Sequence, residues 1–111
     1  MSGIVRIEPS SVEAQPEVVE GPALTRTATA FEPGLGLEAG IWEAKPHTEY
    51  IPSQTCDEVC VILEGTVYLR LPDGTEHAFG PGDAFAIEQG TECTWHQDDR
   101  VRKVFVTRER D

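Results

Sequence analysis

The stretch Asp57-Glu-Val-Cys-Val-Ile-Leu-Glu-Gly65 predicts a β-strand that runs into a glycine turn. Side chains alternate along a strand, so two faces follow: Cys56, Glu58, Cys60 and Ile62 on one, and Asp57, Val59, Val61 and Leu63 on the other. The acid on the Cys/Ile face must point into a lined cavity or have a partner, because a buried and unpaired carboxylate is costly. Glu58 is therefore the first candidate for a functional residue, and we expect the later hairpins to close around it.

Short alternating runs separated by Gly, Pro and Asp turns make up most of the remaining chain. We predict strands over residues 3–7, 25–31, 39–45, 56–63, 66–71, 75–79, 84–88, 92–97 and 101–108, and a loop over 46–52. No segment has a convincing helical pattern. Such a series is typical of an antiparallel sandwich or barrel. We predict an all-β fold with one barrel domain over residues 25–111. Residues 1–24 form an acidic lead-in that lies over the domain or over a partner subunit.

The charge of the chain is uneven. Residues 1–99 carry 18 acids and 4 bases, whereas residues 100–111 carry 5 bases and 2 acids, within a net charge of −11. This balance argues against a nucleic-acid partner, because phosphate binding needs a basic surface. The basic tail can meet an acidic face of its own chain or of a second copy, or it can protect a strand edge from aggregation.

Neither a membrane span nor a secretion signal is evident, since no apolar run reaches 18 residues and the N-terminus lacks a charged-then-apolar pattern. The chain has three cysteines. Cys56 and Cys60 are about 13 Å apart along one strand, too far for a disulfide. We expect a reduced, cytoplasmic protein.

Several motifs between residues 40 and 104 resemble the cupin superfamily. They are Gly40-Ile-Trp-Glu43, Asp57-Glu58 through Leu63-Glu-Gly65, Phe79-Gly-Pro-Gly-Asp-Ala-Phe85, Gly90 with Thr94-Trp95, and Val101-Arg-Lys-Val104. More narrowly, the chain resembles the small single-domain cupins grouped with the ureidoglycine aminohydrolase-like cupins, over about residues 38–106. The resemblance implies a small antiparallel β-barrel of the jelly-roll type, usually dimeric. It also implies a divalent metal in the barrel of many members.

The metal ligands of the superfamily are mostly absent. The first cupin motif supplies two His and a Glu and ends E-x6-G; Glu58 and Gly65 match, but Pro52 and Gln54 stand where the histidines would be. In the second motif, Cys93 stands in place of the metal-binding His. A divalent metal would therefore need an altered set of ligands, such as Glu58 and Cys93 with Cys56 or Cys60, to which His47 or His96 could add a nitrogen. The alternative is that each cysteine is a small buried hydrophobe.

An enzyme without a tightly held metal is a second hypothesis. Glu58 would act as a general acid or base, and Cys93 as a nucleophile if a positive charge lowered its pKa. We expect no Lys or Arg on the pocket face of the strands that carry Glu58 and Cys93. No positive charge would then lower the pKa of the Cys93 thiol. By family analogy alone, the reaction would be that of a hydrolase or isomerase on a small nitrogenous or sugar-like metabolite.

A small-molecule-binding protein is the leading hypothesis. Trp42 and Trp95 would form an aromatic wall beside Glu58 that suits a small cationic or polar ligand, unless both are ordinary core residues. The predicted pocket consists of Trp42, Gln54, Glu58, Cys60, Cys93 and Trp95. Val59, Val61 and Leu63 lie on the opposite face and need a cover, so we expect a homodimer formed by sheet packing.

Overall fold

The computed structural model describes residues 3–110 and contains ten strands and one short helix. Residues 1, 2 and 111, the outermost residues of the two predicted segments, lie outside this part. The elements are η1 (Pro9–Ala14), β1 (Val18–Glu20), β2 (Ala23–Gly34), β3 (Leu37–Ala44), β4 (His47–Ile51), β5 (Asp57–Glu64), β6 (Val67–Arg70), β7 (Glu76–Phe79), β8 (Ala84–Ile87), β9 (Cys93–Gln97) and β10 (Val101–Arg108).

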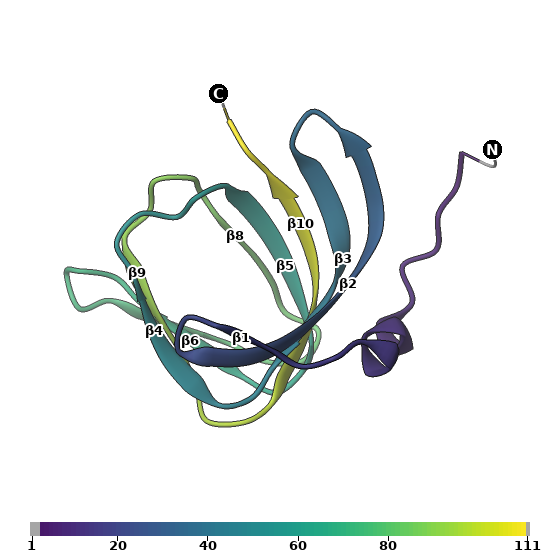
Figure 1. Cartoon of the computed structure of the whole chain (residues 1–111). Coiled ribbons are helices and arrows are strands. Elements are labelled where there is room, and N and C mark those ends of the chain that lie inside the picture. Colours follow the sequence, from purple (N-terminus) through teal and green to yellow (C-terminus); the bar gives the residue numbers. More distant parts are fainter. Residues whose placement is uncertain (1–2, 111) are drawn as a thin grey trace.

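The strands form two antiparallel sheets that face each other (Figure 1). One sheet has the order β1-β2-β3-β10-β5-β8 and the other β4-β9-β6-β7. The core between them contains six buried residues, with four partly buried apolar side chains packed against these: Ile62, Val67, Leu69, Ile87, Trp95 and Val101, with Trp42, Ile51, Phe79 and Phe85. The expected all-β antiparallel barrel is confirmed. No helix within residues 3–110 is long and apolar enough to cross a membrane.

The central strand has the predicted phase. Cys60 and Ile62 are fully buried, whereas Val59 on the other face is 49% exposed. The strand ends at Glu64, and Gly65 follows with φ +79°; a Cβ built at Gly65 would lie 2.2 Å from the carbonyl oxygen of Arg100. Only glycine fits this turn, because an L-residue is strained at positive φ and has no room for its side chain. The turn carries the chain from β5 of the larger sheet into β6 of the smaller one.

Three local predictions are wrong. Residues 3–7 form no strand, and residues 46–52, expected as a loop, contain strand β4. Pro46 and Pro52 flank β4 without interrupting it, and proline is tolerated at a strand end because no ladder hydrogen bond is lost there. The helix η1 was also missed; Pro9 occupies its first turn, where the absent N–H has no cost.

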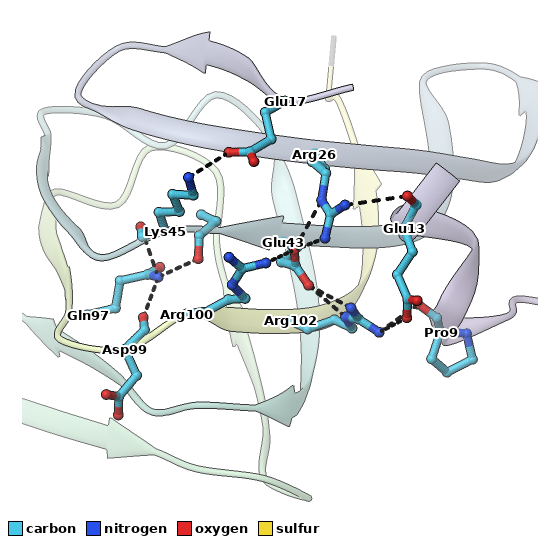
Figure 2. Close-up of polar contacts among 11 residues, drawn as sticks. Pro9, Glu13, Glu17, Arg26, Glu43, Lys45, Gln97, Asp99, Arg100 and Arg102 are labelled. Carbon is cyan, nitrogen blue, oxygen red and sulfur yellow. Dashed lines mark hydrogen bonds and ion pairs between the residues drawn. The ribbon is translucent and has the colours of Figure 1, made fainter. Parts of the chain in front are cut away.

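The N-terminal segment is fixed to the outer face of the larger sheet. Val12 of η1 is fully buried and packs in a cluster with Ala28 and Ile41. Beside this cluster, Figure 2 shows the buried carboxylate of Glu43 bound by Arg26, Arg100 and Arg102. Arg102 also reaches Glu13 in η1, at 3.1 Å. These contacts fasten the helix to β2, β3 and β10. Strand β1 and the first two residues of β2 also belong to the predicted lead-in.

The basic tail pairs with acids of its own chain. Besides Arg100 and Arg102 at Glu43, Lys103 binds Glu58, and Arg110 binds both Asp57 and Glu88. This outcome favours the first of the three roles considered for the tail.

The outer face of the larger sheet carries two apolar rows that cross five strands. Directly opposed residues share a face, so the strand register defines each row. One row, which we call the outer row, is Phe31, Ala39, Val106, Val59 and Ala86. The other, which we call the inner row because part of it lies under the cluster around Val12, is Ala28, Ile41, Val104, Val61 and Ala84. The cluster around Val12 covers part of the inner row, whereas Phe31, Val59 and Val106 remain 39%, 49% and 37% exposed.

Candidate functional site

A cavity of about 470 Å³ lies inside the barrel, between the larger sheet and strands β4 and β9. Side chains from β2, β3, β5 and β10 form one wall, and His47, Glu49 and Ile51 of β4 form part of the other. The volume is that of an ordinary small-molecule site.

An ion pair lies on the cavity wall. Lys103 Nζ, from β10, lies 2.8 Å from Glu58 Oε2, from the neighbouring strand β5. Gln54 donates its side-chain amide to the other carboxylate oxygen of Glu58, at 3.2 Å. The side chains of Lys103 and Glu58 are 7% and 14% exposed. Both charges are therefore largely removed from water and compensate each other, which is the condition for keeping them inside a protein.

Two indole rings complete the surroundings of the ammonium. Lys103 Nζ lies 4.4 Å from the ring centroid of Trp42 and 4.6 Å from that of Trp95. The two rings meet edge to face, with centroids 5.6 Å apart. These distances are within the range of cation–π attraction, which is strongest for tryptophan and increases when the cation is desolvated. Lys103 thus has a carboxylate on one side and aromatic faces on two others.

Gln97 holds Trp95 in this arrangement. The indole N–H of Trp95 donates to Gln97 Oε1 at 3.0 Å. The amide group of Gln97, which is buried, donates to the backbone carbonyls of Ala44, Lys45 and Asp99 (Figure 2). The aromatic wall is therefore preformed by the fold.

The ionisation of these groups follows from their contacts. Burial raises the pKa of Glu58, but the charge and hydrogen bond of Lys103, with further hydrogen bonds from Cys60 and Gln54, bring it below the ordinary value. Burial lowers the pKa of Lys103, yet the Glu58 carboxylate outweighs this and raises it. Burial also raises the pKa of Cys60 to about 12. At neutral pH the site contains a carboxylate, an ammonium and an un-ionised thiol.

Four of the six predicted pocket residues line this cavity: Trp42, Gln54, Glu58 and Trp95. Cys60 is fully buried beside Glu58 and hydrogen-bonds to it without lining the cavity. Cys93 instead lines a second cavity of about 330 Å³, with Phe79 and Phe85. The structure therefore places the two candidates Glu58 and Cys93 at different cavities.

Lys103 is the functional candidate that sequence reasoning missed: no Lys or Arg was expected on the strands of Glu58 and Cys93, but Lys103 reaches Glu58 from the neighbouring strand β10. The signal was present in the alternation of β10: Val101, Lys103 and Phe105 are all buried, whereas the residues between them are more exposed. The two histidines considered as metal ligands lie on different sides of the barrel wall. His47 lines the cavity from β4, whereas His96 bonds Thr48 and Asp98 on the outer face of β9.

The residues around Glu58 do not fit a divalent metal. One oxygen of Glu58 already binds the Lys103 ammonium, and the other accepts the amide of Gln54. Within residues 3–110, no group of three or more His, Cys, Asp or Glu side chains is placed to hold a metal ion. A structural or catalytic zinc usually needs three or four converging protein ligands.

Comparison with known proteins identifies the family. A model described as the EutQ-like cupin domain matches residues 32–105. No match was found among curated proteins. The Clostridium difficile EutQ structure is similar over 96% of this chain and 82% of its own, with a TM-score of 0.69 and 21% identity.

Two enzymes share the same fold. Ectoine synthase from P. lautus has 19% identity and a TM-score of 0.69 over 96% of this chain and 78% of its own. The polyketide cyclase RemF from Streptomyces resistomycificus has 20% identity and a TM-score of 0.70, over 93% of this chain and 78% of its own. At these identities the likeness shows the fold alone, whereas the family model covers both predicted cupin motifs. The chain belongs to the EutQ-like cupin family.

Proposed function

We propose that this cupin domain binds a small organic molecule in its barrel cavity, beside the Glu58–Lys103 pair. The observation that carries the proposal is an ion pair and two indoles held together on the wall of a cavity of about 470 Å³. The lining combines apolar side chains, such as Trp42 and Ile51, with polar and charged groups held in fixed positions, and a cavity of this size with converging polar groups is typical of a small-molecule site. The narrower resemblance to ureidoglycine aminohydrolase-like cupins and the cytoplasmic location remain predictions.

Binding is favoured over catalysis because neither Lys103 nor Cys60 is in the ionisation state that a nucleophile needs. The Lys103 ammonium is kept protonated by Glu58, so it is a poor nucleophile, and the Cys60 thiol has a pKa of about 12. The alternative, a hydrolase or isomerase, would use Glu58 as its base. It would replace the proposal if a bound molecule were recovered chemically changed, as determined by mass spectrometry.

A matched pair of variants tests the site. Thr27 lines the cavity from β2, so Thr27→Phe should fill part of it, whereas Thr94→Phe adds the same ring to the outer face of β9. A thermal-shift screen of small cations, anions and neutral metabolites is expected to give ligands that stabilise the native protein and Thr94→Phe but not Thr27→Phe. Ligands that stabilise all three equally would contradict the location of the site.

We also propose that a second copy of the chain covers the exposed part of the outer apolar row. This row continues across β2, β3, β10, β5 and β8, so two copies can pack face to face about a twofold axis. Contiguous exposed apolar surface of this kind is typical of an interface.

A further inference from the structure

The carboxylates of the cavity exceed its basic groups. Glu20, Glu38, Glu49 and Glu58 line it, and Lys103 is the single Lys or Arg among the described lining residues. Because Lys103 neutralises Glu58, the other three carboxylates determine the net charge. None of these three forms an ion pair within residues 3–110. Glu20 and Glu38 accept hydrogen bonds from the hydroxyls of Thr25 and Thr29.

These three carboxylates, called free here because none has an ion-pair partner within residues 3–110, lie toward two ends of the cavity. Glu20 accepts a hydrogen bond from the Thr25 hydroxyl, and Thr25 is directly opposite Ala44 at the end of β3. Glu49 belongs to the same end, because a Cβ built at Gly21 would lie 3.8 Å from its Oε2. Glu38 is near the start of β3. The six residue steps from Glu38 to Ala44 correspond to about 20 Å of extended strand.

Trp42 lies between these ends and already contacts a cation. The Lys103 ammonium lies 4.4 Å from the centroid of the Trp42 ring and 4.6 Å from that of Trp95. The surface between the terminal carboxylates therefore combines aromatic area with tolerance for an ammonium group. A chain of methylene groups can pack along Trp42 and Ile51 while its charged ends reach the carboxylates.

We propose that the ligand of this cavity is a linear organic polycation, a diamine or polyamine whose ammonium groups bind the carboxylates at both ends. This inference rests on the proposed function and assigns its ligand class. Glu20 and Glu49 hold one terminus and Glu38 the other. An anion of similar length is excluded by the same three charges.

A graded series of probes tests the ligand class. Propylamine, putrescine and spermidine carry one, two and three amino groups, and succinate is an anionic counterpart of putrescine. Titration calorimetry at about 0.15 M salt is expected to show affinity rising from propylamine to spermidine by about tenfold or more, and no binding of succinate.

Variants of equal charge separate the cavity from the general acidity of the protein. The substitutions Glu20→Gln, Glu38→Gln and Glu49→Gln, made together, keep an acceptor oxygen at each position. Glu8→Gln, Glu76→Gln and Asp99→Asn remove three exposed charges outside the cavity. We expect the first variant to lose spermidine affinity by about tenfold or more and the second by less than about threefold.

Equal losses in the two variants, or tighter binding of succinate than of putrescine, would overturn the ligand class. Binding of a neutral or anionic molecule that Thr27→Phe blocks would keep the proposed function and refute the polycation. Absence of binding by all the amines also refutes the polycation, and the metabolite screen then decides on the proposed function separately.

Discussion

Replacing Lys103 by methionine removes the ammonium from the cavity wall and leaves the Glu58 carboxylate without its partner. Removing one member of a buried ion pair costs roughly 3–5 kcal/mol, because the remaining charge stays desolvated. The Glu58 side chain is 14% exposed and retains the amide of Gln54, so the lower end of this range applies. We expect Lys103→Met to lower the free energy of unfolding by about 3 kcal/mol at neutral pH.

The loss should depend on pH with a definite sign. In the native protein the pKa of Glu58 lies below its ordinary value of 4.5, so the pair contributes stability above about pH 4.5 that is lost as pH falls through the folded pKa. In Lys103→Met, burial remains as the largest influence and raises the pKa of Glu58 above its unfolded value. The folded variant then binds a proton more readily than the unfolded chain. Its deficit relative to the native protein should therefore shrink between about pH 7 and pH 5.

A double variant distinguishes lost attraction from damaged packing. Lys103→Met combined with Glu58→Leu removes both charges, and we expect it to be more stable than Lys103→Met alone by about 2 kcal/mol. Urea unfolding followed by tryptophan fluorescence, at one fixed protein concentration, measures all three proteins. A pH-independent loss below about 1 kcal/mol in Lys103→Met, or a double variant less stable than the single one, would refute the reasoning.

Four further predictions concern the rest of the fold. Glu43→Gln should lower the free energy of unfolding by about 2–3 kcal/mol, because three arginines lose their carboxylate partner. It should also speed proteolysis of residues 9–17, and an unchanged rate would contradict the role of Glu43 in anchoring η1. Gly65→Ala should cost about 2–4 kcal/mol, and clearly more than Gly74→Ala, which has positive φ but open space. Native Cys60 should react with iodoacetamide more slowly than half-buried Cys56 at mildly alkaline pH, because burial raises the pKa of both thiols but also shields Cys60 from the reagent, as peptide mass mapping would show. Val59→Glu should convert a dimer into a monomer in sedimentation velocity, whereas Val19→Glu, on exposed β1, should not; a native protein that sediments only as a 12.2 kDa monomer would refute the dimer.

Alternation was the most informative signal in the sequence. It predicted most strands to within a few residues, and it placed Glu58, Cys60 and Ile62 on the inner face of β5. The same rule applied to β10 would have placed Lys103 on the inner face. Lys103 was instead considered only as part of the basic tail, whereas in the structure a carboxylate on the next strand compensates the cost of burying it.

The remaining differences come from three-dimensional contacts. The helix η1 is too short to show a period, and its position depends on Val12 packing against Ile41, which is distant in sequence. Cys93 has the predicted phase on β9, yet it lies at another cavity, because the pairing of whole strands decides which inner residues meet. The free carboxylates of the cavity come from β1, β3 and β4, and no local motif relates them.

Intrinsic fluorescence gives the most direct test of ligand binding in the barrel. The chain has two tryptophans, Trp42 and Trp95, and both line the cavity, so their emission reports on this site. Titration with putrescine and spermidine is expected to produce a saturable change in the native protein and in Thr94→Phe, and none in Thr27→Phe. A saturable change that persists in Thr27→Phe, or no change with the amines and with every member of the metabolite screen, would contradict a ligand site beside Glu58 and Lys103.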